Sequence, residues 1–379
     1  MNFSLCDEQV MLQDAVRRYL RERYGFEQRR ELIREAASNP SVWNGIVELG
    51  IMGAAIPEDL GGLGGGPVET MIIAEAMGEA LVTEPYLETA VIAGGLLKRI
   101  GGEAAAGLLE KLVAGEAKFA LAMSERTSRY NIADVTTTAR KDGDNWVIDG
   151  AKAVVEGAPS ASYLLVTART SGSQRDERGI SLFVVDCSAA SFTEHAYRLI
   201  DDRGASDIEF AGLRLPVDAL LGTEGSALPL LEQVRDEAIA AMCADAVGAM
   251  RRMLQDTIDY TKQRRQFGQP LASFQVLQHR MVDMYMAIER AVSATYLATL
   301  KLDADPVERA KAASAAKVTI AETGRFVGQN AVQLHGGMGM TDELAVGHYF
   351  KRVTAVESRF GSRDYHLARY ARLSRAKAA

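Results

Sequence analysis

The sequence contains few cysteines and no long apolar run. Its three cysteines, Cys6, Cys187 and Cys243, lie far apart, with no CxxC pair and no cluster with histidine. This pattern argues against a disulfide framework and indicates no zinc or other metal site. No stretch of roughly eighteen apolar residues occurs, and the acidic opening MNFSLCDEQV lacks the basic start of a signal peptide. We therefore expect a cytoplasmic protein without a membrane span.

Positive charge is also scarce. Lysine and arginine number 43 against 50 acidic residues, which gives a net charge of -7, and no basic stripe stands out. Nucleic acid is therefore not an expected partner, and a small soluble ligand fits better. What the chain does have is length and apolar content. Its 379 residues, 47% of them hydrophobic, can fill two or three packed subdomains.

The hydrophobic period changes twice along the chain, which predicts a multidomain α+β fold. Residues 1–117 carry apolar side chains at helical spacing, so we expect an N-terminal helical domain. Residues 118–222 alternate with period two, and the pairs Asp142-Gly143 and Asp149-Gly150 suggest turns. This segment predicts an antiparallel β-barrel or sandwich. Helical periodicity returns in residues 223–379 and predicts a C-terminal domain like a four-helix bundle.

The expected C-terminal helices are long. Three segments of about thirty residues each carry an apolar stripe, and no internal repeat supports a solenoid instead. The third helix begins at the sequence DPVE, where Asp305 can cap the helix and Pro306 can occupy its first position.

Two short motifs in this last part can bind a nucleotide. They are RRQFGQPLASFQ, residues 264–275, and QLHGGMGM, residues 333–340. Arg264 offers donors for phosphate oxygens, Phe267 a stacking surface, Gln333 directional hydrogen bonds and Gly337 space for close approach. A simpler interpretation remains open for each motif, in which Arg264 pairs locally and Gly336-Gly337 only end a helix.

In this domain order, the motifs resemble those of the acyl-CoA dehydrogenase family. The similarity covers essentially the whole chain: the opening FSLCDEQ, the segments AMSE and DGAK of the β domain, the RRQFG loop, and QLHGGMGM with the tail that follows it. Within the family, the chain looks most similar to small subunits of the pimeloyl-CoA dehydrogenase type. The resemblance implies FAD, an acyl-CoA substrate, a tetramer, a role in fatty acid metabolism, and electron-transferring flavoprotein as the electron acceptor.

The resemblance also implies which residues bind the cofactor. In the family, a glutamate removes the α proton of the thioester and the β hydride passes to flavin N5. Several of the matching positions contact the dinucleotide across a subunit interface. The positions that match cofactor-binding residues are Ser124, Arg264, Phe267, Gln275, Gln333, Gly337 and Ser362.

The chain departs from the family at the catalytic positions. The usual Glu-Gly-Thr falls on Phe360-Gly361-Ser362, and phenylalanine cannot accept a proton. The glycine-rich family segment that begins Thr-Glu-Pro-Gly is replaced by SERTSRYN, residues 124–131, of which Ser124 keeps the hydroxyl. The Trp-Ile-Thr beside the flavin ring is replaced by Val154-Val155-Glu156. A carboxylate at Glu156 is expected to disfavour an anionic reduced flavin.

Two other acids are alternative candidates for the base. Some family members carry it on the first long helix of the bundle, where this chain has Ala238 with Glu237 one residue earlier. One residue turns a helical side chain by about 100°, so Glu237 requires an offset helix. Glu357 lies about one turn before Phe360. Both residues also fit an ordinary role as solvated acids.

Three hypotheses follow for the function. The first is a subunit without the usual base in a heteromeric acyl-CoA dehydrogenase, such as an α2β2 assembly, whose base comes from a homologous chain. The second is a self-sufficient homotetrameric dehydrogenase that uses Glu237. The third is a flavin-free scaffold or acyl-CoA-binding protein with the same fold.

Overall fold

The computed structural model describes residues 4–35 and 40–376, which group into two compact units. One unit, the helical unit, contains residues 4–35, 67–82 and 239–376. The other, the sheet unit, contains residues 40–66 and 83–238. Met1 to Phe3, part of the acidic opening, lie outside the described residues.

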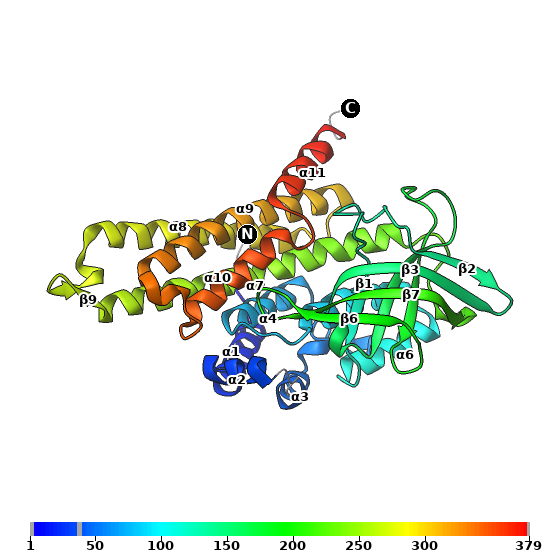
Figure 1. The fold of residues 1–379 in the computed structure, drawn as a ribbon, viewed down its shortest axis with the longest axis horizontal. Helices are drawn as coiled ribbons and strands as arrows, with labels where there is room; N and C mark the ends of the chain where they lie inside the picture. Colours follow the sequence, from blue (N-terminus) through cyan, green and yellow to red (C-terminus); the bar gives the residue numbers. More distant parts are fainter. Residues whose placement is uncertain (1–3, 36–39, 377–379) are drawn as a thin grey trace. The chain divides into compact units, whose positions relative to one another are not determined.

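The helical unit is built around one long helix, α9. This helix contacts α8, α10 and α11 (Figure 1). The helices of the unit are α1 (Asp7–Arg23), α2 (Phe26–Glu35), α4 (Pro67–Glu79), α8 (Gln275–Leu300), α9 (Pro306–His335), α10 (Ala345–Ser358), α11 (Arg363–Ala376), the short η6 (Leu271–Ser273) and η7 (Gly336–Met340), and the part of α7 (Leu228–Gln263) from Ile239 onward. A two-stranded hairpin, β9 (Arg265–Gln266) and β10 (Gln269–Pro270), lies between α7 and α8.

Glycines allow α4 and α7 to pack with their backbones in contact. A Cβ atom on Gly78 would lie 1.8 Å from the Asp245 carbonyl oxygen, and one on Gly248 would lie 1.9 Å from that of Glu75. Any larger residue at either position would force the two helices apart. The apolar residues of α8 that face inward, among them Met281, Met284, Ile288 and Ala291, are buried as the helical spacing predicts.

The sheet unit combines a mixed sheet with shorter helices. Its helices are α3 (Pro40–Glu48), α5 (Gly94–Ile100), α6 (Gly102–Val113), the beginning of α7, and the short η1 (Ile51–Gly53), η2 (Glu58–Leu60), η3 (Leu87–Ala93), η4 (Ala158–Ser160) and η5 (Val217–Ala219). Its strands are β1 (Phe119–Ala122), β2 (Thr138–Asp142), β3 (Asn145–Glu156), β4 (Tyr163–Arg169), β5 (Ile180–Asp186), β6 (Thr193–Arg198), β7 (Gly204–Pro216) and β8 (Leu220–Leu221).

The strand order is β6-β7-β3-β2-β4-β5-β8, with β1 paired to β4. Most pairs are antiparallel, as expected, but β1 and β2 each pair with β4 in parallel. The described strands form an open sheet, so the barrel alternative does not occur among them. Aromatic and aliphatic side chains fill its core, with Trp146 packed edge to face against Phe183 at 5.1 Å between ring centroids.

Several sequence expectations can be compared directly with these elements. The three long C-terminal helices are confirmed, and Asp305 caps α9 by accepting hydrogen bonds from the backbone N–H groups of Val307 and Glu308 at 3.1 and 3.2 Å. The turn predicted at Asp149-Gly150 is wrong. This pair lies within β3 at a bulge, where Gly150 has φ +143° and a Cβ atom would lie 2.6 Å from Thr137.

No helix among the described residues is long and apolar enough to cross a bilayer.

Candidate functional site

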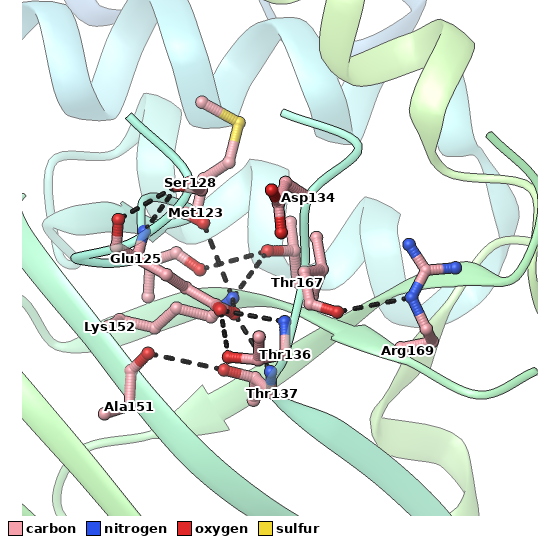
Figure 2. A network of polar contacts seen from close by, with 12 residues as sticks. Met123, Glu125, Ser128, Asp134, Thr136, Thr137, Ala151, Lys152, Thr167 and Arg169 are labelled. Atoms are coloured by element: carbon pink, nitrogen blue, oxygen red, sulfur yellow. Dashed lines mark hydrogen bonds and ion pairs between the residues drawn. The ribbon is translucent and has the colours of Figure 1, made fainter. Parts of the chain in front are cut away.

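A buried ion pair ties the start of the segment that replaces the family's glycine-rich loop to strand β3. Figure 2 shows this network around Glu125 and Lys152. The Lys152 ammonium is fully buried and donates to Glu125 Oε1 at 2.8 Å, to Thr167 Oγ1 at 3.1 Å and to the Met123 carbonyl at 3.4 Å. An ammonium group removed from water is stable in a protein interior only when acceptors replace its lost hydrogen bonds, and these three oxygens do so for Lys152.

The Glu125 carboxylate also accepts hydrogen bonds from two threonines. It accepts the backbone N–H of Thr136 at 2.8 Å, the Thr136 hydroxyl, and the backbone N–H of Thr137 at 3.0 Å. Burial opposes ionisation of Glu125, but the Lys152 charge and these donors outweigh it and hold the Glu125 pKa at about 2. Burial lowers the Lys152 pKa to about 8 although Glu125 opposes the shift. The network therefore fixes both ends of the segment from residue 123 to residue 137.

The adjacent, exposed part of the segment is joined to a strained bulge in β3. The register between β3 and β7 shifts between Lys152 and Val155, and Val154 takes φ +53° with its side chain half exposed. A β-branched residue rarely adopts this conformation, which costs about 1–3 kcal/mol. Asp207 on β7 lies at this bulge and accepts the Val154 N–H at 3.0 Å.

Asp207 also binds two other segments. Its carboxylate accepts from Arg126 Nη2 at 2.8 Å and from the Tyr197 hydroxyl at 2.9 Å. One side chain thus connects the segment 124–131, the bulge of β3 and the edge strand β6. A backbone hydrogen bond also joins the segment 124–131 to β3: the Ala153 N–H, next to Val154, donates to the Ser124 carbonyl at 2.9 Å. Ser124 itself is exposed.

Glu156 is not an isolated negative charge. Its Oε2 lies 3.6 Å from Arg203 Nη1, and Arg203 Nε donates to Asp201 Oδ2 at 2.7 Å. All three side chains are largely removed from solvent. Because Arg203 is shared between Glu156 and Asp201, the three groups together still carry one net negative charge, and the expected repulsion between Glu156 and a reduced flavin stays a prediction.

Glu237, the first alternative base, is bound by Arg99. The single guanidinium of Arg99 donates twice, from Nη1 to Glu237 Oε2 at 3.1 Å and from Nη2 to Glu237 Oε1 at 2.5 Å. Gln233, with its amide oriented to place oxygen toward Arg99, adds two contacts of 3.1 Å. Such a two-pronged pair orients both carboxylate oxygens toward one cation.

The nucleotide motif between α7 and α8 folds as a tight hairpin. Phe267 and Gly268 have φ +53° and +81°, the values of a two-residue hairpin turn. The Phe267 side chain is 89% exposed, and its ring contacts Phe274 edge to face at 6.1 Å. Arg264 and Gln275 are also exposed, and neither side chain has a hydrogen bond or ion pair to any residue that the structure describes. The simpler interpretation, a local salt bridge of Arg264, is therefore wrong.

The second nucleotide motif, residues 333–340, contains one glycine packed against neighbouring atoms and two glycines with free space around them. His335 stacks on Tyr260 at 4.3 Å between ring centroids, and burial lowers the His335 pKa. A Cβ atom on Gly339 would lie 2.7 Å from the Val332 carbonyl oxygen, whereas Gly337 has no described atom within 4 Å of such a Cβ. Packing inside the chain thus explains Gly339 but not Gly337. Gln333 is exposed beside this open position.

The turn that carries Phe360 is held in an unusual conformation. Phe360 has φ +55°, and its carbonyl lies 3.1 Å from His366 Nε2. The buried Lys317 ammonium donates to the carbonyls of Gly361 at 2.5 Å and Glu357 at 3.0 Å. A Cβ atom on Gly361 would lie 2.5 Å from the Tyr365 ring. A left-handed aromatic residue persists only where its surroundings fix the backbone in this way.

The two remaining candidates in this turn have other roles. Ser362 caps α11 by accepting the Tyr365 N–H through its hydroxyl at 3.3 Å. Glu357, the second alternative base, forms an ion pair with Arg325. The structure therefore places no unpaired carboxylate at either alternative position.

The two groups of candidate cofactor-binding positions differ in their contacts within the chain. Arg264, Gln275 and Gly337 are exposed and have no side-chain hydrogen bond or ion pair with the described residues, whereas the segments matching the ring-binding positions are engaged with Asp207 and Arg203. Sequence reasoning did not select Asp207, Arg203 or Lys317. Their partners are distant in the sequence, and only the segment DGAK, which contains Lys152, gave a signal for the buried network.

Comparison with known proteins agrees with this organisation. Family models match in three consecutive parts: the acyl-CoA dehydrogenase N-terminal domain over residues 6–116, the middle domain over 120–213 and the C-terminal domain over 235–374. Acyl-CoA dehydrogenase FadE12 of Mycobacterium tuberculosis is 30% identical over 353 residues, which cover 91% of this chain and 90% of that protein. The human mitochondrial short-chain specific acyl-CoA dehydrogenase is 29% identical and matches 81% of this chain and 76% of its own length.

Two solved structures support the same conclusion. A variant of the steroid acyl-CoA dehydrogenase Tcur3481–Tcur3483 aligns with a TM-score of 0.87 at 27% identity, covering 98% of this chain and 99% of that one. The ChsE4–ChsE5 complex from Mycobacterium tuberculosis aligns with a TM-score of 0.87 at 25% identity, covering 100% and 99%. The chain belongs to the acyl-CoA dehydrogenase family.

Proposed function

We propose that this chain is the subunit without the usual base in a heteromeric FAD-dependent acyl-CoA dehydrogenase. Such an enzyme removes hydrogen from the α and β carbons of an acyl-CoA thioester. The observation that carries the proposal is the anchored turn with Phe360 in the base position, held by Lys317 and His366. Two similar structures are named as two-component proteins, Tcur3481–Tcur3483 and ChsE4–ChsE5.

The proton chemistry argues for a base from another chain. Removing the α proton needs a titratable group within hydrogen-bond reach, and such a group typically contributes about 10²–10⁴-fold to the rate. Phe360 has no such group. Glu237 and Glu357 are each bound to an arginine, so using either as a base requires breaking an ion pair. A homologous subunit that retains the Glu-Gly-Thr sequence would supply the missing carboxylate.

The residues of this chain that suit FAD would bind its adenosine and pyrophosphate half. Arg264 would donate to phosphate oxygens, and Phe267 would give a flat apolar surface. Gln275 and Gln333 would donate or accept hydrogen bonds, and Gly337 would leave room for close approach. When bound, FAD supplies the hydride acceptor for the β hydrogen. Ser124 and Ser362 belong to the same proposal as weaker contributors, since Ser362 already caps a helix.

Several finer points belong to the same proposal. The assembly is an α2β2 tetramer in the cytoplasm, it acts in fatty acid metabolism, and it passes electrons to electron-transferring flavoprotein. The acyl group remains open among dicarboxylyl, aromatic and sterol side-chain thioesters, since residues that line an acyl cavity have no sequence pattern of their own.

The test is co-expression with a homologous chain that keeps the glutamate. We expect the purified complex to contain FAD and to oxidise an acyl-CoA, while this chain alone gives less than one flavin per chain and no turnover. Replacing the glutamate of the homologous chain by glutamine should abolish turnover and leave the flavin bound. Full flavin occupancy with turnover by this polypeptide alone would refute the proposal.

A flavin-free scaffold is the second candidate, favoured by one observation. The segments that match the ring-binding positions are closed by internal contacts of Asp207 and Arg203. A visible spectrum of the co-expressed complex separates the two candidates, because bound flavin absorbs near roughly 450 nm and an empty fold does not.

A further inference from the structure

A buried histidine, His348, connects helix α10 to helix α2 and to the loop that follows the second nucleotide motif. The residue is 8% exposed, and its ring packs edge to face against Phe26 of α2 at 5.1 Å between ring centroids. Its Nδ1 lies 3.2 Å from Arg29 Nη1, and its Nε2 lies 3.3 Å from the Asp342 carbonyl oxygen. All of these residues belong to the helical unit.

The two partners of His348 require one protonation form of the ring. A guanidinium has donors only, so Nδ1 must accept a hydrogen bond from Arg29. A carbonyl oxygen only accepts, so Nε2 must carry a hydrogen and donate it to Asp342. Together these conditions define the neutral imidazole with its hydrogen on Nε2. With the hydrogen on Nδ1 instead, an N–H group would face Arg29 and a lone pair would face the carbonyl, so both hydrogen bonds would be lost.

Arg29 is itself held in place, so it can orient the ring. It is 1% exposed, and its Nε donates to the Leu81 carbonyl at 2.9 Å. Leu81 follows the end of α4 and has φ +56°. Helix α10 binds the same region, because the Tyr349 hydroxyl donates to the Glu79 carbonyl at 2.6 Å. The end of α4 thus gives Arg29 a fixed support.

The loop that this histidine binds is directly connected to the second nucleotide motif. Thr341, next to Asp342, donates through its N–H and its hydroxyl to the Met338 carbonyl at 3.2 and 3.0 Å. The Asp342 carboxylate is also bound by Lys351 at 3.2 Å, but this ion pair is exposed, where such pairs contribute little. A shift of the Asp342 backbone would therefore move the end of the motif that contains the exposed Gly337.

We propose that His348 is a positioning residue for the adenosine side of the FAD site. Arg29 fixes the orientation of the ring, and the ring fixes the Asp342 carbonyl and with it the second nucleotide motif. His348 is buried, so it acts through the motif and not by contact with the cofactor. The inference rests on the proposed role of this motif in FAD binding. No local pattern in the sequence reveals the contact, because Arg29 and His348 are 319 residues apart.

The substitution His348→Phe in the co-expressed complex tests the positioning role. It keeps an aromatic ring against Phe26 and removes both hydrogen bonds. We expect amide hydrogen exchange of residues 336–344 to become about three- to tenfold faster and FAD affinity of the apo-complex to fall by the same factor, which is the effect of one lost hydrogen bond. His348→Gln, whose amide supplies one donor and one acceptor, should restore most of both quantities. His195→Phe, the same substitution at an exposed histidine, is the matched control and should change neither.

Nitrogen-15 NMR of the histidine-labelled wild-type chain tests the form of the ring without any variant that has to bind FAD. The spectrum of His348→Gln identifies the signal among the five histidines by its absence. We expect Nε2 to be protonated and Nδ1 to be unprotonated at pH 7. A hydrogen on Nδ1 would overturn the proposal, and this result decides against it even if His348→Phe does not fold.

The remaining outcomes separate this proposal from the proposed function. Unchanged exchange in a folded His348→Phe would overturn the positioning role. Faster exchange with unchanged FAD affinity would also overturn it, and the proposed function would stand if Arg264→Ala still lowers FAD affinity. If neither His348→Phe nor Arg264→Ala lowers FAD affinity, this chain does not hold the adenosine half of FAD and both proposals fail.

Discussion

At the residue scale, ion pairs decide which acids can act as a base. Glu237 is 12% exposed and shares both carboxylate oxygens with Arg99. A general base must instead present an oxygen to the substrate carbon, since proton transfer requires direct approach. The same geometry suits a structural role, because the pair joins α5 to the beginning of α7 within the sheet unit.

The substitution Glu237→Gln separates these two roles. We expect turnover of the co-expressed complex to stay within about twofold of wild type, because the base lies on the other chain. The free energy of unfolding should fall by about 1–3 kcal/mol, because Arg99 loses its charged partner. Turnover and chemical denaturation measure the two effects. Arg99→Met is the matched control and should give a similar loss of stability; a drop in turnover of about 10² or more in E237Q alone would instead identify Glu237 as the base.

Strained residues are the second feature at this scale. Val154 and Phe360 both have positive φ, and both lie at positions where the family resemblance implies contact with the flavin or the substrate. Each is held by side chains from other segments: Asp207 binds the Val154 N–H, while Lys317 and His366 hold the turn at Phe360. The backbone is therefore held in a strained conformation at two positions where the side chains depart from those of the family.

At the element scale, the Glu125–Lys152 pair makes the folding stability of the chain depend on pH. The Glu125 pKa is about 2 in the folded chain against 4.5 for the free group. Between these values the unfolded chain binds a proton that the folded chain does not bind. The stability contributed by Glu125 is therefore complete above pH 4.5 and is lost as the pH falls toward 2, in total about 3 kcal/mol.

Glu125→Gln should remove this acid dependence. We expect the variant to be less stable than wild type by about 3–5 kcal/mol at pH 7, because the buried Lys152 charge loses its counter-ion. Its free energy of unfolding should also change less than that of wild type between pH 4.5 and pH 3. Urea denaturation at several pH values measures both quantities. The double variant E125Q/K152M removes both charges and should recover much of the loss, whereas an equally steep acid dependence in E125Q would contradict the assignment to Glu125.

Elements with a regular spacing of apolar residues are predictable from the sequence. Elements whose conformation depends on contacts with segments distant in the sequence are not. The stripes of α7, α8 and α9 and the cap at Asp305 follow from spacing and side-chain chemistry. At Asp149-Gly150 the sequence predicts a turn and the structure has a bulge, because an Asp-Gly pair favours both conformations and only pairing with the neighbouring strand decides between them. The hairpin β9–β10 was not expected as strands, since a two-residue turn that begins with phenylalanine is unusual.

At the scale of the whole molecule, the residues that the motifs propose for FAD differ in exposure from the segments that match the ring-binding positions. Arg264, Phe267, Gln275, Gln333 and Gly337 were selected from motifs, and the structure leaves all of them exposed. The contacts that close the ring-facing segments come from Asp207 and Arg203, residues with no motif, which meet their partners only through the folded sheet. A sequence pattern records local spacing, and these contacts are not local.

This asymmetry predicts how the assembled enzyme holds its cofactor. If this chain binds FAD through the adenosine and pyrophosphate, Arg264→Ala in the co-expressed complex should reduce the flavin content and raise the FAD dissociation constant about tenfold or more, because a charged donor to a phosphate is lost. ADP should compete with FAD for loading, whereas FMN should neither bind well nor compete. Fluorescence titration of the apo-complex measures each affinity.

Arg265 supplies the matched control for this experiment. It lies next to Arg264 in the same hairpin, but its guanidinium donates to the Gly268 carbonyl at 3.1 Å. Arg265→Ala should therefore lower FAD affinity much less than Arg264→Ala, although both variants lose one positive charge from the same exposed hairpin. Equal losses in the two variants would point to a general effect of charge, and failure of ADP to compete would mean that this chain does not hold the adenosine half of FAD.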